Sequence, residues 1–248
     1  PNELLICSAA RLLEDQQIAL IGAGIPVLAA ALARRIHAPN LVAMFEFGGT
    51  GAPLEKLPLT AGSQNSFHQA MAASGICDIV EAAQRGFVEF AVLGAAQIDP
   101  YGNLNTTLIG DHDHPRVRLP GAGGGNDAAS HCWRTMVMMR QDKKKFVASL
   151  DFLSTPGFLD GPGARERAGL PAGSGPYRVV TDLAILGYNQ VTKRMLLLAT
   201  QPGVSIEQVV ENTGFHLGIA SQVIENPPPT AEELRILREE VDLGRVYI

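Results

Sequence analysis

The stretch Ala38-Pro-Asn-Leu-Val-Ala-Met-Phe-Glu46-Phe-Gly-Gly-Thr-Gly-Ala-Pro53 joins an apolar run to one carboxylate and a glycine-rich turn. Leu41 to Phe45 is short, wholly apolar and bounded by proline and glycine, which is typical of a buried strand in an α/β sheet. Glu46 then follows the carboxyl end of that strand, where open α/β sheets bind their ligands. Because an unpaired charge is costly to bury, Glu46 is either a solvated residue at the end of the strand or a carboxylate with a functional role.

The preceding segment predicts a strand, a glycine turn and a helix. Gln17–Ile21 is apolar after its first residue, Gly22-Ala23-Gly24 supplies the turn, and the Ala- and Leu-rich stretch Pro26–His37 has proline in its first turn and arginines near its last. The dinucleotide fingerprint G-x-G-x-x-G needs a third glycine where Val27 stands, so the sequence disfavours NAD binding. The glycines either let the backbone approach a ligand or simply make the turn tight.

A second glycine-rich stretch, Gly121-Ala-Gly-Gly-Gly-Asn126, leads into small residues typical of a helix start. Such a loop exposes backbone N–H groups, which favour an anion or a developing oxyanion, and glycine is required where a side chain would block the approach. A flexible linker fits poorly, because the flanking residues are apolar and the run lacks a linker's serine or proline extension.

The remaining pattern predicts one α/β domain over residues 1–248, with a hairpin-rich second half and no internal repeat. We expect the following elements: helices at 2–15, 77–85, 205–212 and 231–241; strands at 87–93, 135–139 and 145–150; a turn at 94–105; a long loop at 154–177; and a hairpin of 177–186 with 195–200.

Composition excludes several classes of function. With 248 residues, 46% of them apolar, the chain can bury a full core, and its net charge of −5 argues against a nucleic-acid or anionic-membrane partner. Cys7, Cys77 and Cys132 are scattered and odd in number, so we expect reduced thiols in a cytoplasmic protein. The sequence carries no signal peptide and no apolar stretch of membrane-spanning length.

Two polar segments each allow two interpretations. Gly110-Asp-His-Asp-His114 could hold a metal, but consecutive side chains diverge and no further cluster completes a ligand shell, so we expect a polar loop and no metal. His68, in the loop 62–68, is either catalytic or simply exposed.

Several motifs together carry a family resemblance. They are Ala38-Pro39 leading to Glu46-x-Gly48; Gly94-x-Ala-Gln-Ile-Asp-Pro-Tyr-Gly-Asn103-x-Asn105; Gly121-x-Gly-Gly; Ser154-x-Pro-Gly157-x-x-Asp-Gly-Pro-Gly163-x-Arg-Glu-Arg-x-Gly-Leu-Pro171; and Glu211-Asn-Thr-Gly-Phe215. From about residue 17 to residue 243, the chain resembles the class I (family I) coenzyme A transferases, and most closely the β subunit of the glutaconate CoA-transferase type.

That resemblance implies a Rossmann-like open sheet and a homologous α subunit that shares the active site, in a higher oligomer of αβ units. It implies that Glu46 is the nucleophile of a covalent, ping-pong transfer of CoA between an acyl-CoA and a carboxylic acid, which we expect to be dicarboxylic. The expected site residues are Gly123, Gly124, Gly125 and Asn126 for the oxyanion or CoA, and Gly24, Phe47, Gly48 and Gln97 for the substrate pocket.

The sequence also departs from the glutaconate pattern. Phe47 stands where a serine is expected after the glutamate, and residues 49–80 diverge in the region that shapes the acyl pocket. Related proteins include a decarboxylase and a CoA-linked ring-opening hydrolase, which lack the glutamate. Acyl-CoA hydrolysis or decarboxylation, and a subunit without catalysis, are therefore the alternatives to transfer.

Overall fold

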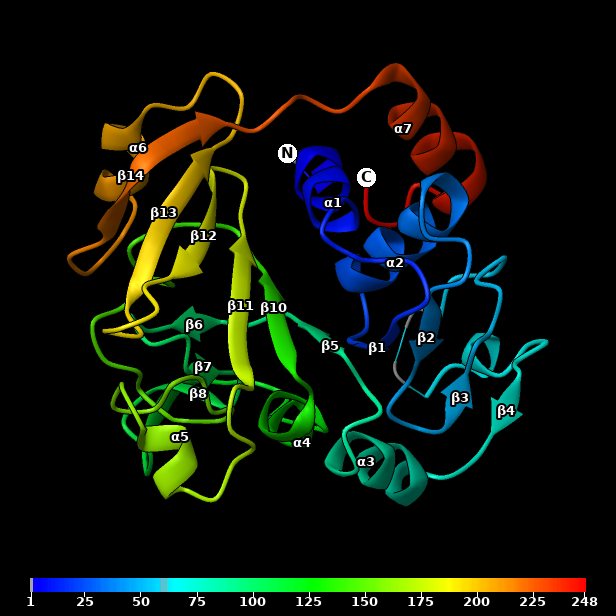
Figure 1. Ribbon diagram of the computed structural model, residues 1–248, viewed down its shortest axis with the longest axis horizontal. Coiled ribbons are helices and arrows are strands. Elements are labelled where there is room, and N and C mark those ends of the chain that lie inside the picture. The colour runs from blue at the N-terminus through cyan, green and yellow to red at the C-terminus, as the bar shows by residue number, and fades with distance from the viewer. Residues whose placement is uncertain (1, 59, 61) are drawn as a thin grey trace.

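A mixed ten-stranded sheet runs through the molecule, in the order β14-β13-β12-β11-β10-β5-β1-β2-β3-β4 (Figure 1). The computed structural model describes residues 2–58, 60 and 62–248. The strands of this sheet are β1 Ile18–Ile21, β2 Val42–Met44, β3 Gly49–Thr50, β4 Ala72–Ala73, β5 Phe90–Leu93, β10 Arg134–Met138, β11 Gly175–Val180, β12 Ala184–Tyr188, β13 Met195–Thr200 and β14 Gly218–Glu225.

The centre of the sheet is parallel, and this decides where strand ends meet. β2, β1, β5, β10 and β11 pair in parallel, whereas β12 and β13 continue the sheet as antiparallel neighbours and β3 and β4 close the other edge. The predicted strands at 17–21, 41–45, 87–93 and 135–139 are confirmed within one to three residues. Their carboxyl ends lie along one border of the sheet.

Helices cover both faces of the parallel strands. The helices are α1 Asn2–Ala10, α2 Ile25–Ile36, α3 Ile76–Gln84, α4 Gly125–His131, α5 Ala164–Arg167, α6 Ile206–Glu211 and α7 Ala231–Ile236, with a 3-10 turn η1 at Gln64–Ser66 and a π-helical turn η2 at Leu237–Val241. Figure 1 shows α1, α2 and α7 together at one side with both chain ends beside them, and α3 and α4 together elsewhere.

Alternation along each strand divides the core between these two layers. Ala19 and Ile21 of β1 pack into the cluster formed with α1 and α2, whereas Leu20 between them packs into the cluster formed with α3 and α4. Phe90 and Ala91 of β5 divide in the same way. Successive side chains of a strand point to opposite faces, so strands buried on both faces have continuous apolar runs as their sequences.

The ends of the chain are fastened together by a partly buried ion pair. Arg11 donates to both carboxylate oxygens of Glu233, at 2.7 and 2.6 Å, and also to the carbonyls of Pro227 and Pro228. Burial raises the pKa of Glu233, but the hydrogen bonds from Arg11 and from Thr230 outweigh it and hold that pKa below its ordinary value. Arg11 therefore joins the residues after α1 to the start of α7.

Three sequence-based expectations need correction. The strand predicted at 145–150 is absent, because Phe146 and Val147 form only isolated bridges and the residues after them are largely exposed. The strand predicted at 177–186 is two strands, β11 and β12, since Thr181 accepts from two backbone amides and turns the chain back. The first helix ends at Ala10 rather than near residue 15.

The second half builds its own smaller cluster. The short pairs β6 Gln97–Ile98 with β7 Leu104–Asn105, and β8 Leu108–Gly110 with β9 Pro115–Arg118, form two separate hairpins. Ile98 and Leu104 pack with Phe146 and with inward residues of β11 to β13. The predicted turn at 94–105 is thereby held against the long loop, which contains α5 and ends at residue 174 rather than 177, because β11 begins at Gly175.

Candidate active site

Glu46 occupies the tight turn between β2 and β3. The Gly48 N–H donates to the Phe45 carbonyl at 2.9 Å, and the Phe45 N–H donates to the Gly49 carbonyl at 2.8 Å. Gly48 has φ of +115°, and a Cβ there would lie 1.9 Å from the Ser74 carbonyl oxygen, so only glycine fits. The carboxylate is consequently projected at the carboxyl end of β2, as the sequence predicts, in a half-buried position.

The second glycine stretch meets this carboxylate directly. The Gly124 N–H donates to Oε1 of Glu46 at 2.8 Å, across 78 positions of sequence. A Cβ on Gly124 would lie 2.9 Å from both Cγ and Cδ of Glu46, so glycine is required for the carboxylate to lie here. A Cβ on Gly123 would lie 3.5 Å from either carboxylate oxygen. The glycine loop and the turn that carries Glu46 are therefore in direct contact.

The Gly125 amide and the Asn126 side chain, which follow Gly124, form hydrogen bonds with groups other than Glu46. The Gly125 N–H donates to the Ala122 carbonyl at 2.9 Å, which closes the turn that starts α4. The Asn126 side chain donates to the Ser154 carbonyl at 3.1 Å. Asn126 therefore ties the start of α4 to the long loop, and of the amides at Gly124 and Gly125 only the first faces the carboxylate.

The far end of α4 is held by a buried arginine. Arg165, 2% exposed, donates to the carbonyls of Ala129 and Ser130 in the last turn of α4, at 3.0 and 3.2 Å, and to the Gly157 carbonyl at 2.8 Å. Burial lowers the pKa of Arg165 to about 10, so the guanidinium stays protonated at neutral pH. The long loop thus clamps both ends of the helix that presents Gly124.

A cavity of about 430 Å³ opens beside Glu46, at the point where the strand order reverses. β1 lies between β2 and β5 in the sheet. The chain passes from β1 to β2 on one side and later adds β5 on the other side of β1. Gly22 and Ala23, which follow β1, and Leu93 to Ala96, which end and follow β5, line the cavity together with Glu46. Open α/β sheets bind ligands at such a switch point.

The remaining walls of this cavity are mostly apolar. They are Leu104, Thr106, Leu119 to Ala122, Gly125 and Thr155, so no Lys, Arg or His of the described chain lines it. Sequence reasoning missed Thr106 and Thr155, which lie in irregular loops with no periodic signal. Sequence reasoning anticipated Gly22 only as part of a turn. In the structure, a Cβ at Gly22 would lie 2.9 Å from the Val92 carbonyl oxygen, so glycine is needed for the end of β1 to approach β5.

The four expected pocket residues do not line this cavity. Gln97 is 4% exposed and is held by Asn105 and Asp151, within the turn at 94–105. Gly24 is the residue before α2, and Gly48 is packed against Ser74. Phe47, next to Glu46, is 50% exposed. Their part in substrate binding stays a prediction, and only Phe47 offers a side chain to an incoming molecule.

The turn at 94–105 owes its shape to buried polar groups. Burial raises the pKa of Asp99, against hydrogen bonds from the Asn103 side chain and from the backbone of Tyr101 and Asn103 that lower it. Asn103 also accepts from the Gly157 and Leu159 amides. These contacts bind the turn to the long loop, so they hold in place a motif whose Gly94 and Leu104 line the cavity.

The two polar segments lie in exposed turns. Residues 111–114 form the turn between β8 and β9, where the Asp111 carboxylate accepts from the backbone amides of Asp113 and His114. His68 is exposed in the segment after η1. Among residues 2–58, 60 and 62–248, no three His, Cys, Asp or Glu side chains gather as a metal site. No helix in the part described has the length and hydropathy needed to cross a membrane.

Comparison with known proteins identifies the family of this chain. A family profile described as Coenzyme A transferase matches residues 4–212. The β subunit of glutaconate CoA-transferase from Acidaminococcus fermentans is 37% identical over 256 residues, covering 100% of this chain and 94% of that protein. The β subunit of 3-oxoadipate CoA-transferase from Pseudomonas knackmussii is 38% identical over 238 residues, covering 96% and 91%.

The same relationship is seen in three dimensions. The crystal structure of glutaconate coenzyme A-transferase from Acidaminococcus fermentans matches with a TM-score of 0.94 at 36% identity, covering 100% of this chain and 97% of that one. The chain therefore belongs to the coenzyme A transferase family, as the β subunit of a heteromeric family I CoA-transferase similar to glutaconate CoA-transferase.

Proposed function

We propose that this subunit, with a homologous α subunit, moves CoA between an acyl-CoA and a carboxylic acid through a glutamyl-CoA thioester on Glu46. The observation that carries the proposal is the hydrogen bond of 2.8 Å from the Gly124 N–H to Oε1 of Glu46, at the edge of the switch-point cavity. It holds one carboxylate oxygen and leaves Oε2 without a donor from the described residues.

The first half-reaction consists of two displacements at carbonyl carbon. Oε2 of Glu46 attacks the thioester carbonyl, the C–S bond breaks, and a mixed anhydride forms with release of the CoA thiolate. The thiolate then attacks Cδ of Glu46, which expels the substrate acid and leaves CoA bound to Glu46 as a thioester. The second half-reaction reverses these steps with an acceptor acid, which regenerates the free carboxylate.

Gly124 supports the steps that occur at Cδ. When the thiolate attacks, negative charge develops on the oxygen that stays on Cδ, and a backbone donor already stands 2.8 Å from Oε1. Donors at about 2.7–3.1 Å from a developing oxyanion stabilise the transition state without reorganisation. The clamps on α4 from Asn126 and Arg165 keep this amide in place.

The apolar cavity suggests which groups each subunit supplies. Its volume of about 430 Å³ suits a short acyl chain and the thiol arm of CoA, within the range of about 300–1,000 Å³ common for small ligands. The second carboxylate of a dicarboxylic acid would meet no cation from the described residues of this chain. We therefore assign the partner of that carboxylate to the α subunit, together with the outer part of the pocket near Phe47.

Trapping the intermediate tests the proposal. The αβ complex is incubated with glutaconyl-CoA or another acyl-CoA, treated with borohydride or hydroxylamine, and digested for mass spectrometry. We expect modification at Glu46 and appearance of acetyl-CoA when acetate is added. Free acid without CoA transfer would instead assign hydrolysis, because water would have intercepted the same intermediate. Release of CO₂ without CoA transfer would assign decarboxylation, which breaks a carbon–carbon bond of the acyl group. Absence of turnover with every acyl-CoA would leave a subunit without catalysis.

Substitution of the nucleophile gives a second test. Glu46→Gln should abolish transfer while the complex still assembles, because the amide is nearly isosteric but a poor nucleophile. Glu46→Asp should lose about 100-fold or more, since withdrawing the carboxylate by one methylene misplaces it for attack. Glu207→Gln, an exposed position on α6, is the matched control and should keep full activity. Undiminished CoA exchange in Glu46→Gln would overturn the assignment.

A further inference from the structure

A second cavity lies at the opposite border of the sheet. It has a volume of about 200 Å³ and is lined by Arg134 at the amino end of β10, by Gly175 to Arg178 at the start of β11, and by residues around α5 and the turn after β12. Glu46 follows the carboxyl end of β2, and β2, β1, β5, β10 and β11 are parallel. The two cavities are therefore separated by the length of the strands.

Cations dominate this second cavity. Arg165, Arg178 and Lys193 line it, against the single carboxylate of Glu166. Among the described residues, the Arg178 guanidinium donates only to the neighbouring Tyr177 carbonyl and lies over the Tyr177 ring at 4.1 Å, and the Lys193 ammonium lies over the Phe158 ring at 5.2 Å. In the ranges that the structure describes, none of these three cations lies within 4 Å of a carboxylate oxygen.

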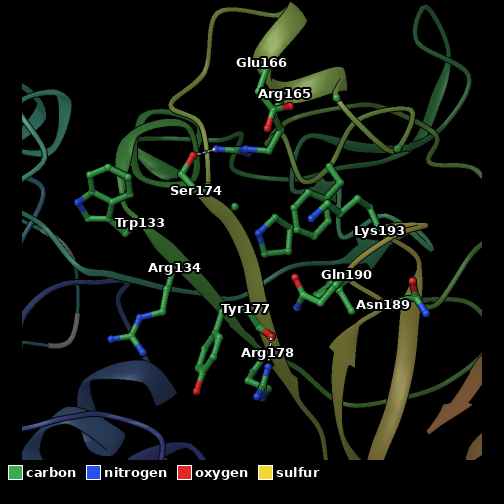
Figure 2. A pocket seen from close by; sticks show the side chains of 17 residues that line it. Trp133, Arg134, Arg165, Glu166, Ser174, Tyr177, Arg178, Asn189, Gln190 and Lys193 are labelled. Carbon is green, nitrogen blue, oxygen red and sulfur yellow. Dashed lines mark hydrogen bonds between the residues drawn. The ribbon is translucent and has the colours of Figure 1, made fainter.

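Arg134 is the fourth cation that lines this cavity, but its charge is already neutralised by two carboxylates. Its guanidinium donates to Glu14 and Glu89 at 2.6 Å each and lies over the Phe90 ring. In Figure 2 its head group points away from Arg165 and Lys193.

Arg165 supplies a buried donor that no protein group uses. Its two terminal nitrogens donate to carbonyls and to the Ser174 hydroxyl, whereas its Nε–H, also buried, has no partner among the described residues. Gly175 lies directly beside that nitrogen and also lines the cavity: a Cβ there would be 3.2 Å from Nε, so a larger residue would press on the Arg165 side chain. An unpartnered buried donor on a charged group is costly unless a ligand satisfies it.

The walls between the cations are aromatic. Trp133, Phe158 and Tyr177 line the cavity with the three cations, as Figure 2 shows for the labelled Trp133 and Tyr177. The volume is below the range of about 300–1,000 Å³ typical of larger ligands, so the space admits a small molecule only. Guanidinium groups recognise planar carboxylates and phosphates through paired N–H donors, and an ammonium adds a point charge.

We propose that this cavity is a binding site for a small divalent oxyanion, a phosphate or a short dicarboxylate. In the site, Arg178 and Lys193 provide the charge that attracts the anion, and the buried guanidinium of Arg165 adds a third positive charge. The site is separate from the CoA-transfer centre, so its occupancy needs no acyl-CoA. Because Arg165 also holds the last turn of α4, an anion here contacts the residue that supports the helix presenting Gly124.

A fluorescence titration tests this directly, because Trp133 is the single tryptophan of the chain and lines the cavity. The full chain is titrated with inorganic phosphate and, separately, with glutarate, at constant ionic strength. We expect a saturable change in tryptophan emission, and the tighter of the two probes identifies phosphate or carboxylate as the natural group. Calorimetry on the αβ complex with the same probes should give a matching Kd.

Two variants and one control locate the anion. Arg178→Gln and Lys193→Gln should each raise the Kd about tenfold, since a charge-assisted hydrogen bond contributes at least that factor. Arg194→Gln removes the same charge one residue from Lys193, but Arg194 faces Tyr101 and does not line the cavity, so its Kd should equal that of the unaltered chain. A linear, non-saturating response to both probes, or an equal Kd in all four proteins, would overturn the proposal.

Discussion

The contact between Gly124 and Glu46 predicts a steric coupling that can be measured without any substrate. In Gly124→Ala the new methyl carbon would lie 2.9 Å from Cγ and Cδ of Glu46, against an optimal carbon–carbon separation of about 3.5–4.0 Å. Glu46 or α4 must therefore move by about 0.6 Å or more. Such overpacking costs about 1–3 kcal/mol of the free energy of unfolding.

The cost should disappear when the glutamate side chain is removed. Gly124 has φ of −77°, which alanine adopts without strain. In a Glu46→Ala background, Gly124→Ala should therefore be neutral or stabilise by about 0.4–1 kcal/mol through the unfolded chain. The double-mutant cycle then gives a coupling free energy of about 1–3 kcal/mol, the size observed for side chains in direct contact.

Urea denaturation of the four proteins, followed by Trp133 fluorescence and by circular dichroism, measures this coupling. Gly125→Ala is the matched control: its methyl would lie 3.5 Å from Oγ1 of Thr155, an ordinary contact, so its effect should be small and equal in both backgrounds. An equal cost of Gly124→Ala with and without the Glu46 side chain would refute the reasoning. In the αβ complex, a carboxylate displaced by up to about 1 Å should lower CoA transfer by about 100-fold.

Three further predictions concern other parts of the molecule. Glu233→Gln should destabilise the chain by about 1–3 kcal/mol at pH 7; because the pKa of Glu233 is depressed, this difference should be complete above about pH 4.5 and shrink as the pH falls below it. Cys77 alone should react rapidly with iodoacetamide, since burial raises the pKa of the Cys7 and Cys132 thiols to about 12. Arg165→Met should cost about 3 kcal/mol or more, because it leaves several buried carbonyls without donors.

Control variants at neighbouring exposed positions separate these specific effects from the general effects of a substitution. Glu232→Gln changes an exposed carboxylate next to Glu233 and should show little dependence on pH. Arg167→Met, exposed on α5, should leave stability within about 0.5 kcal/mol. A constant Glu233→Gln effect from pH 7 to pH 3, equal labelling of all three thiols in the folded protein, or equal stability of the two arginine variants would each contradict the corresponding prediction.

The long-range contacts explain why some predictions failed. Phe146 and Val147 are apolar, as in a strand, but in the described structure each has only one bridging partner: Ile98 in the short strand β6 for Phe146, and Gly214 after α6 for Val147. Gln97, whose part in the substrate pocket stays a prediction, has a side chain held by Asn105 and Asp151. Whether a strand is extended or a polar side chain is free depends on neighbours that the local sequence does not reveal.

The sequence by itself determined the α/β class, the buried parallel strands and the place of Glu46 at the end of one of them. These follow from apolar runs, prolines and glycines, whose effects on the backbone are local. Only the tertiary structure decided which amide meets that carboxylate, that no described cation lines the cavity beside it, and that the charged cavity lies at the other border. Those features join residues far apart in the sequence, such as Glu46 and Gly124, which are 78 positions apart, and so depend on how the sheet orders its strands.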